Sequence, residues 1–242
     1  EKNSMINYEI KSHLAKLLAT EDLVVEHQNV DTAQFNVETR VLTLPLWKKA
    51  SSVVYDMLVG HEVGHALFTP NRWDFDTPRQ FVNVCEDIRI EKLMKRKYPG
   101  IAKTFYVGYN ALQDEDFFEI DGEDLTTFNL ADRINIHYKV GSFVDVAFST
   151  TEEPIVSVVD SCETFDDVLS AAELLYKFCK KEQEKEKEEK AKNHEQAKMF
   201  YDECMENAGI EDYPPFEEEE EIDSSDGGTA SELEVLTDTA FE

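Results

Sequence analysis

The sequence is poor in the residues and patterns that mark several protein classes. Nine Gly and seven Pro among 242 residues, with 41% hydrophobic residues, exclude collagen-like, low-complexity and wholly disordered chains. No apolar run approaches the roughly 18 residues that a membrane helix needs, and residues 1–4 lack the apolar stretch of a signal peptide. The four cysteines form no C-x-x-C pair, which argues against a thiolate zinc site and a disulfide scaffold. We therefore expect a soluble, cytoplasmic chain.

Basic residues are also scarce. The chain has 24 Lys and Arg against 52 Asp and Glu, and its net charge is −28. This charge repels nucleic-acid phosphates and anionic membrane surfaces, so we expect neither as a direct partner. An acidic protein that imitates the charge of DNA and occupies a DNA-binding partner remains an alternative. Residues 211–242 carry 13 acidic residues and no basic one, so nearly half of the net charge lies in this segment.

Hydrophobic periodicity predicts a mostly helical α+β fold. The expected helices cover residues 5–18, 52–68, 78–98, 102–114, 125–139 and 165–205. Two expected strands, at 23–25 and 34–46, form a small sheet that packs on the helix at 52–68.

Composition divides the chain into three parts. We expect residues 1–178 to form the folded domain, residues 179–210 a charged helical extension, and residues 211–242 an acidic disordered linker. Seven Lys and six Glu interleave over residues 180–198, a pattern typical of a solvated helix with local ion pairs. A helix that docks a partner is the alternative interpretation of this run.

The cluster His61-Glu62-Val63-Gly64-His65 carries the strongest chemical signal in the chain. Two histidines four residues apart lie on the same helix face, so both imidazoles can converge on one ion. A zinc ion in such an incomplete protein shell activates a water molecule, and a nearby carboxylate takes the proton. The small and apolar flanks, 59–60 and 66–68, predict a buried helix, in which unpaired imidazoles are costly. A bound metal ion removes that cost.

We expect the third ligand from the next helix, whose residues 83–91 carry three carboxylates among apolar side chains. Glu86 follows His65 by 21 residues, which leaves room for a turn and for an antiparallel second helix. Glu86 is the preferred ligand, with Asp87 and Glu91 as alternatives. Asp87 and Glu91 share a helix face, so either could instead accept a hydrogen bond that fixes a histidine tautomer. Without a metal, the carboxylates would pair with basic residues of their own helix, Arg89, Lys92 and Lys95.

The stretch from His61 to Phe68 resembles the active-site helix of the zincin metallopeptidases, and a Glu on the following helix resembles their gluzincin branch. Ile90 stands four residues after Glu86, which departs from the Glu-to-Asp spacing of many gluzincins. With residues 83–91, the segments 97–100 and 108–109 resemble metallopeptidase-like proteins of large tailed bacteriophages. In that group an acidic linker leads to a von Willebrand factor A-like domain, which here would lie beyond Glu242.

The resemblance implies zinc as the cofactor, with His61, His65 and Glu86 as metal ligands and Glu62 as general base and then proton donor. It also implies an edge strand, here from Phe35 to Leu44, to which an extended peptide adds as a further strand. Zincins usually add a Tyr or His that stabilises the oxyanion, and the candidates in this sequence are Tyr106, Tyr109 and His137.

Three functions follow from these patterns. The leading expectation is a zinc-dependent peptidase that acts on a peptide or protein, located in the host cytoplasm if the chain is encoded by a phage. The second is a catalytically silent, zinc-stabilised interaction module, for which the resemblance suggests a ring ATPase of the MoxR type as partner. The third is charge mimicry of DNA, whose binding to a DNA-handling enzyme would weaken steeply as salt rises.

Overall fold

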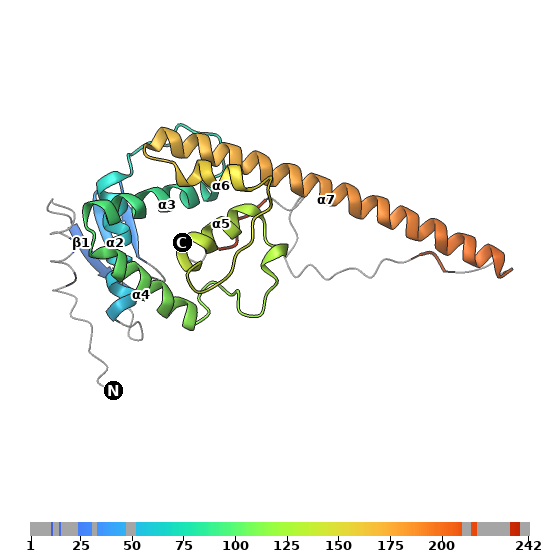
Figure 1. Ribbon diagram of the computed structural model, residues 1–242, viewed down its shortest axis with the longest axis horizontal. Helices are drawn as coiled ribbons and strands as arrows, with labels where there is room; N and C mark the ends of the chain where they lie inside the picture. The colour runs from blue at the N-terminus through green and yellow to red at the C-terminus, as the bar shows by residue number, and fades with distance from the viewer. Residues whose placement is uncertain are drawn as a thin grey trace. The chain divides into compact units, whose positions relative to one another are not determined.

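The computed structural model describes residues 11, 15, 24–30, 33–46, 52–209, 214–216 and 233–237 (Figure 1). These residues belong to two compact units, residues 1–176 with 235–242 and residues 177–234. The helix expected at 5–18 lies outside the described residues, apart from Lys11 and Ala15, which are both helical.

The described strands form one small mixed sheet in the order β1-β3-β2. Strand β1 (Val24–Gln28) runs parallel to β3 (Val41–Pro45), and β2 (Gln34–Asn36) pairs with β3 in the antiparallel sense. Leu42 and Leu44 of β3 are fully buried in the core that also contains helix α2. The expected small sheet packed on this helix is therefore present.

The prediction of one continuous strand from 34 to 46 is wrong, because a turn at 37–40 separates β2 from β3. The side-chain oxygen of Asn36 accepts hydrogen bonds from the backbone N–H groups of Glu38 and Thr39, at 3.0 and 2.9 Å. Arg40 adopts a positive φ of 58° and donates a 2.6 Å hydrogen bond to the carbonyl of Ala66. The turn thereby ties the strand pair to the C-terminal end of α2.

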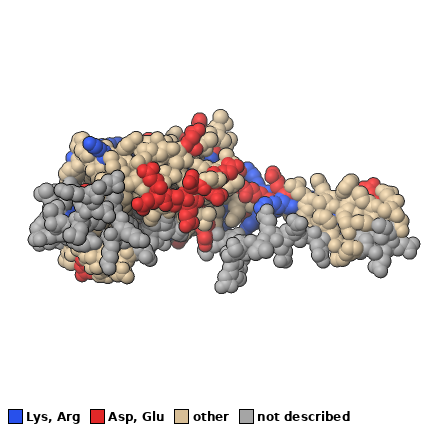
Figure 2. All heavy atoms as spheres, turned by 90° about the horizontal axis from the view of Figure 1, so that it is seen from below, with Lys and Arg blue, Asp and Glu red and all other residues tan. Residues whose placement is uncertain are grey.

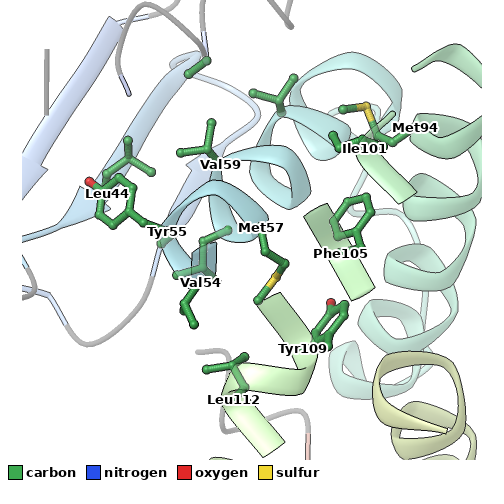
Figure 3. Close-up of a cluster of buried hydrophobic side chains, with 14 of the residues drawn as sticks. Leu44, Val54, Tyr55, Met57, Val59, Met94, Ile101, Phe105, Tyr109 and Leu112 are labelled. Atoms are coloured by element: carbon green, nitrogen blue, oxygen red, sulfur yellow. The ribbon is translucent and has the colours of Figure 1, made fainter. Parts of the chain in front are cut away.

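Helix α2 (Ser52–Phe68) is the central element of the first unit, and its bounds agree with the sequence prediction. Nearly every residue from Val54 to Gly64 is buried, since α2 packs against β2 and against helices α3 and α4 (Figure 1). Helix α3 (Arg79–Lys97) and helix α4 (Ile101–Asp114) also match their predicted positions. Figure 3 shows Met57 of α2 pointing towards the rings of Phe105 and Tyr109 on α4. The helix is therefore enclosed on several sides, as its apolar flanks predicted.

The remaining helices follow the prediction less closely. The expected helix at 125–139 is divided into a short 3-10 turn, η1 (Leu125–Thr127), and α5 (Leu130–Val140). Asn129 separates them, because its side chain caps α5 by accepting a 2.9 Å hydrogen bond from the N–H of Asp132. Helix α6 (Glu153–Asp160) was not predicted, whereas α7 (Phe165–Asn207) was.

A short C-terminal segment packs against α5 instead of continuing the acidic linker. Val235 is fully buried, and the N–H and hydroxyl of Thr237 both donate to Asp132 Oδ1, at 2.7 and 2.8 Å. Asn135 donates a further 3.0 Å hydrogen bond to the Thr237 hydroxyl. The expectation of a disordered linker over 211–242 therefore does not hold for residues 235–237.

The unit formed by residues 177–234 contains the charged part of α7. Lys185 and Glu182 form a 2.6 Å ion pair on this helix, as the interleaved charges predicted. Near the end of the helix, the Tyr201 hydroxyl donates to the carbonyl of Pro214 at 3.1 Å, and Phe216 contacts the rings of His194 and Tyr201. The described part of this unit is thus a helix with a short returning segment.

Two surface properties bear on possible partners. Among the described residues, no helix combines the length and the apolar character required to cross a membrane. Figure 2 shows acidic side chains gathered on the face in view, with few basic ones among them. Along the chain, acidic residues are dense from Asp114, the last residue of α4, to Asp124, where seven of eleven residues are Asp or Glu: Asp114, Glu115, Asp116, Glu119, Asp121, Glu123 and Asp124.

Gly108 permits the close approach of α4 to α2, so its replacement tests the packing of the central helix. A Cβ at Gly108 would lie 2.3 Å from Met57 Cβ and 3.2 Å from the backbone oxygen of Val53. We expect Gly108→Ala to destabilise the fold by about 1–3 kcal/mol through overpacking, measured by thermal or denaturant unfolding. Gly100→Ala is the matched control, since a Cβ at Gly100 meets nothing within 4 Å. Equal stability of both variants would contradict this packing.

Candidate metal centre

Two adjacent helices bring all the predicted site residues of α2 and α3 into one region. Helix α2 contributes His61, Glu62 and His65, and α3 passes beside it with its carboxylates. Gly64 allows this approach: a Cβ there would lie 2.8 Å from Ile90 Cδ1 and 3.1 Å from Met94 Cγ on α3. The glycine inside the histidine motif therefore lets α3 pack closely against α2.

The three side chains that converge are His61, His65 and Asp87. Asp87 Oδ1 lies 3.6 Å from His61 Nε2 and 3.2 Å from His65 Nε2. All three ligand atoms lie within 4.8 Å of one another, and this buried group could hold a metal ion. Two ligands at about 2.1 Å from a tetrahedral ion lie about 3.4 Å apart. The two observed separations from Asp87 fit that geometry.

A buried hydrogen bond orients the ring of His61. Its Nδ1 lies 3.0 Å from Glu91 Oε1, which also accepts a hydrogen bond from the hydroxyl of Tyr109. Because the Glu91 carboxylate is an acceptor, His61 Nδ1 carries the hydrogen, and the lone pair of the neutral ring lies on Nε2. This nitrogen faces Asp87. Glu91 thus has the tautomer-fixing role that its spacing from Asp87 suggested.

A chain of hydrogen bonds orients His65 in the same sense. Its Nδ1 lies 2.9 Å from the hydroxyl oxygen of Thr69, and that hydroxyl donates to Glu86 Oε1 at 2.5 Å. Because the Thr69 hydroxyl gives its hydrogen to Glu86, its oxygen acts as acceptor towards His65. His65 Nδ1 therefore carries the hydrogen, and the lone pair of the neutral ring lies on Nε2. Arg89 holds Glu86 in turn with two 2.7 Å hydrogen bonds.

The candidate for the third metal ligand therefore changes from Glu86 to Asp87. Glu86 forms a two-point pair with Arg89, as the metal-free alternative expected for this residue, and reaches His65 only through Thr69. Asp87, one of the two alternatives, is the carboxylate placed against both histidines. Neighbouring residues point about 100° apart around a helix. Whether Glu86 or Asp87 faces the histidines therefore depends on how α3 is rotated about its axis, which the sequence alone does not determine.

Lys139 completes the surroundings of Asp87. Its ammonium lies 3.0 Å from Asp87 Oδ2, the oxygen that does not face the histidines. The residue is only 6% exposed and comes from α5, which the sequence did not connect with the site. No sequence signal marks it, because it lies 52 residues from Asp87. Thr69, four residues after His65 at the helix end, could have been found by its helical spacing.

These contacts shift the protonation equilibria of the cluster. Although burial lowers the pKa of His61, the charges and hydrogen bonds of Asp87 and Glu91 raise it to about 10. Burial raises the pKa of Asp87, but Lys139 and His61 outweigh it and hold this pKa well below its usual range. Burial also raises the pKa of Glu62. In the absence of a metal ion, His61 therefore keeps a proton between two carboxylates.

A cleft of about 920 Å³ gives access to the cluster. Its lining includes all three converging side chains, Glu62, the edge strand β2 and the segment that follows α2. Glu62 is 7% exposed, and within the described part of the chain no hydrogen bond to its carboxylate is found. Arg79 and Trp73 also line the cleft, and the Arg79 guanidinium lies over the Trp73 ring at 4.8 Å.

The three residues expected to stabilise an oxyanion lie elsewhere. Tyr109 is buried and donates to Glu91, which makes it a support for His61. Burial and the charge of Glu91 raise its pKa well above the usual range, so it remains a donor. Tyr106 is 55% exposed beside Phe143, and His137 packs on Phe148. None of the three is among the residues that line the described cleft.

No protein-family model, curated protein or solved structure matches the chain. The resemblance to zincin metallopeptidases therefore rests on the quoted motifs.

The raised pKa of His61 predicts a pH-dependent metal affinity. One proton must leave His61 for each ion bound, so the apparent affinity for Zn²⁺ should rise about tenfold per unit between pH 6 and pH 8. Isothermal titration calorimetry in buffers of different ionisation enthalpy measures both the affinity and the released proton. An affinity that does not change with pH would contradict the assigned protonation of the cluster.

The same shift predicts how the stability of the metal-free protein changes. The pKa of His61 is higher in the folded state than the ordinary histidine value of 6.5. The contribution of His61 to the free energy of unfolding is therefore fully present below about pH 6.5 and is lost as the pH rises towards about 10. Chelator-treated protein should lose stability over this interval in urea unfolding, and His61→Gln should flatten the profile. A wild-type profile no steeper than that of His61→Gln would refute the assignment.

Proposed function

We propose that the protein is a zinc-dependent peptidase in which His61, His65 and Asp87 hold the metal ion. The observation that carries the proposal is the convergence of two Nε2 atoms on Asp87 Oδ1 at 3.6 and 3.2 Å, inside a cleft. Nitrogen and carboxylate donors in this number leave one position of a four-coordinate zinc site for water or substrate. The proposed ligand set differs from the sequence expectation in one residue, because Asp87 replaces Glu86.

Glu62 is the proposed general base. A zinc ion at this position would supply Lewis acidity, which lowers the pKa of a water molecule and polarises a peptide carbonyl. The Glu62 carboxylate lines the cleft next to His61 and has no hydrogen bond in the described part of the chain that would hold it away. Its raised pKa makes the carboxylate a stronger base, which favours uptake of a proton from the water molecule and its return to the leaving amine.

The proposed substrate is an extended peptide that binds along β2. This strand lies at one edge of the sheet and lines the cleft, so its outer backbone groups can pair with a further strand. The expected edge strand from Phe35 to Leu44 is thereby reduced to Gln34–Asn36, since β3 is the central strand. Backbone pairing of this kind selects an extended shape with little sequence preference.

A zinc-stabilised interaction module is the second candidate. Two large apolar side chains, Met199 and Phe200, are 59% and 69% exposed on α7 in the second unit. Such side chains favour contact with a partner protein, for which a MoxR-type ring ATPase remains the suggestion. In this case the metal serves the fold, and Glu62 has no chemical role.

Charge mimicry of DNA remains the third candidate, supported by the net charge and by the acidic face in Figure 2. Replacement of the five glutamates at 217–221 by glutamine separates it from the others. Peptidase activity should survive this change, whereas a DNA mimic should lose affinity for its partner. A deletion of the whole segment 211–242 is less informative, because Val235 and Thr237 are buried in the first unit.

Replacement of Glu62 by glutamine tests the peptidase directly. Glu62→Gln should leave zinc binding intact, because Glu62 is not one of the converging ligands, and should lower hydrolysis of an unfolded protein substrate by a factor of about 10²–10⁴. Zinc content and cleavage rate are measured on the same preparation.

Glu38→Gln is the matched control, because Glu38 lines the same cleft but is exposed. This variant should cleave at the wild-type rate. Equal hydrolysis by wild type and Glu62→Gln would end the assignment of Glu62. Zinc binding without hydrolysis in the wild type would favour the interaction module.

A further inference from the structure

We propose that Lys139 restricts Asp87 to one metal-binding oxygen and thereby keeps a coordination position open. The inference rests on the proposed metal site and extends it to a residue outside the two site helices. Lys139 is a positioning residue in this account, because it acts through Asp87 and does not line the cleft.

The two oxygens of Asp87 have separate partners. Oδ1 faces the two Nε2 atoms, whereas Oδ2 lies 3.0 Å from Lys139 Nζ in a pair whose side chains are 8% and 2% exposed. A carboxylate can bind a metal ion through one or both oxygens. An ammonium on Oδ2 competes with the ion for that oxygen, so Asp87 ligates through Oδ1 alone.

The burial of Lys139 indicates a specific role for its charge. Removal of an ammonium from water is unfavourable, and a paired carboxylate offsets that cost only with good geometry. Helix α5 supplies this geometry on a polar face, where Asp132 and Asn135 lie seven and four residues before Lys139. Both are held by Thr237, at 2.8 and 3.0 Å, so the C-terminal segment fixes the helix that carries the lysine.

Electrostatics distinguishes this role from simple support of the metal. A positive charge 3.0 Å from a ligand oxygen opposes the binding of a cation. If Lys139 only restricts Asp87, its removal should preserve or increase metal affinity while it changes the coordination. If it only supports the site, its removal should lower the affinity by a factor of about 10–100.

Cobalt(II) is a suitable probe, because its visible absorption is strong in four-coordinate sites and weaker in five-coordinate ones. In Lys139→Met we expect Co²⁺ affinity at or above the wild-type value, with a weaker absorption band as Asp87 binds through both oxygens. Lys139→Arg should restore the wild-type spectrum. Lys95→Met is the matched control, because Lys95 lies 3.7 Å from Glu91 and is partly exposed.

A second measurement needs no variant at position 139. The separation of the symmetric and antisymmetric carboxylate stretches, seen by infrared difference spectroscopy with labelled aspartate, distinguishes one-oxygen from two-oxygen ligation. Zinc-loaded wild type should show the wide separation of one-oxygen ligation, and Asp87→Asn should remove that signal. A narrow separation assigned to Asp87 would overturn the proposal.

The outcomes separate this inference from the proposed function. An unchanged spectrum in Lys139→Met, or lower affinity with an unchanged spectrum, would overturn the role of Lys139 and leave the peptidase intact. A changed spectrum in a protein that cleaves nothing would support the role of Lys139 and remove the peptidase. Wild-type protein that binds no Co²⁺ would overturn both.

Discussion

The approach of two imidazole Nε2 atoms to Asp87 Oδ1 is the interaction on which the account depends. Two buried polar groups, His61 and Asp87, and the half-buried His65 are unfavourable unless each has a partner, and here each ring has its other nitrogen hydrogen-bonded. A divalent cation satisfies the remaining lone pairs together. A proton on His61 does so when no metal is bound, which explains its raised pKa.

The fold serves this arrangement through the packing of α2 and α3. Gly64 lets Ile90 and Met94 approach the histidine helix, and the same approach places Asp87 and Glu91 against the rings. Helices α4 and α5 then contribute one supporting group each, Tyr109 and Lys139. The cluster and its supporting groups together draw on four helices, α2, α3, α4 and α5, so the geometry of the cluster depends on the assembled core and not on one local segment.

The sequence predicted the features that depend on residues close together in the chain. The helix at 52–68 and the shared face of its two histidines follow from spacing alone. The choice between Glu86 and Asp87 does not, because it depends on how α3 is rotated and on the capture of Glu86 by Arg89. Lys139 could not be predicted, since its contact with Asp87 spans 52 residues. The alternating pattern at 34–46 predicts one strand, but the Asn36 side chain stabilises a turn that divides it into β2 and β3.

The most direct test is a crystal structure of the zinc-loaded protein, with data collected on both sides of the zinc absorption edge. The account predicts one anomalous peak in the cleft, about 2.0–2.2 Å from His61 Nε2, His65 Nε2 and Asp87 Oδ1, with a fourth position that no protein side chain occupies. A peak ligated by Glu86, a site closed by a fourth side chain, or no peak between the two histidines would contradict it.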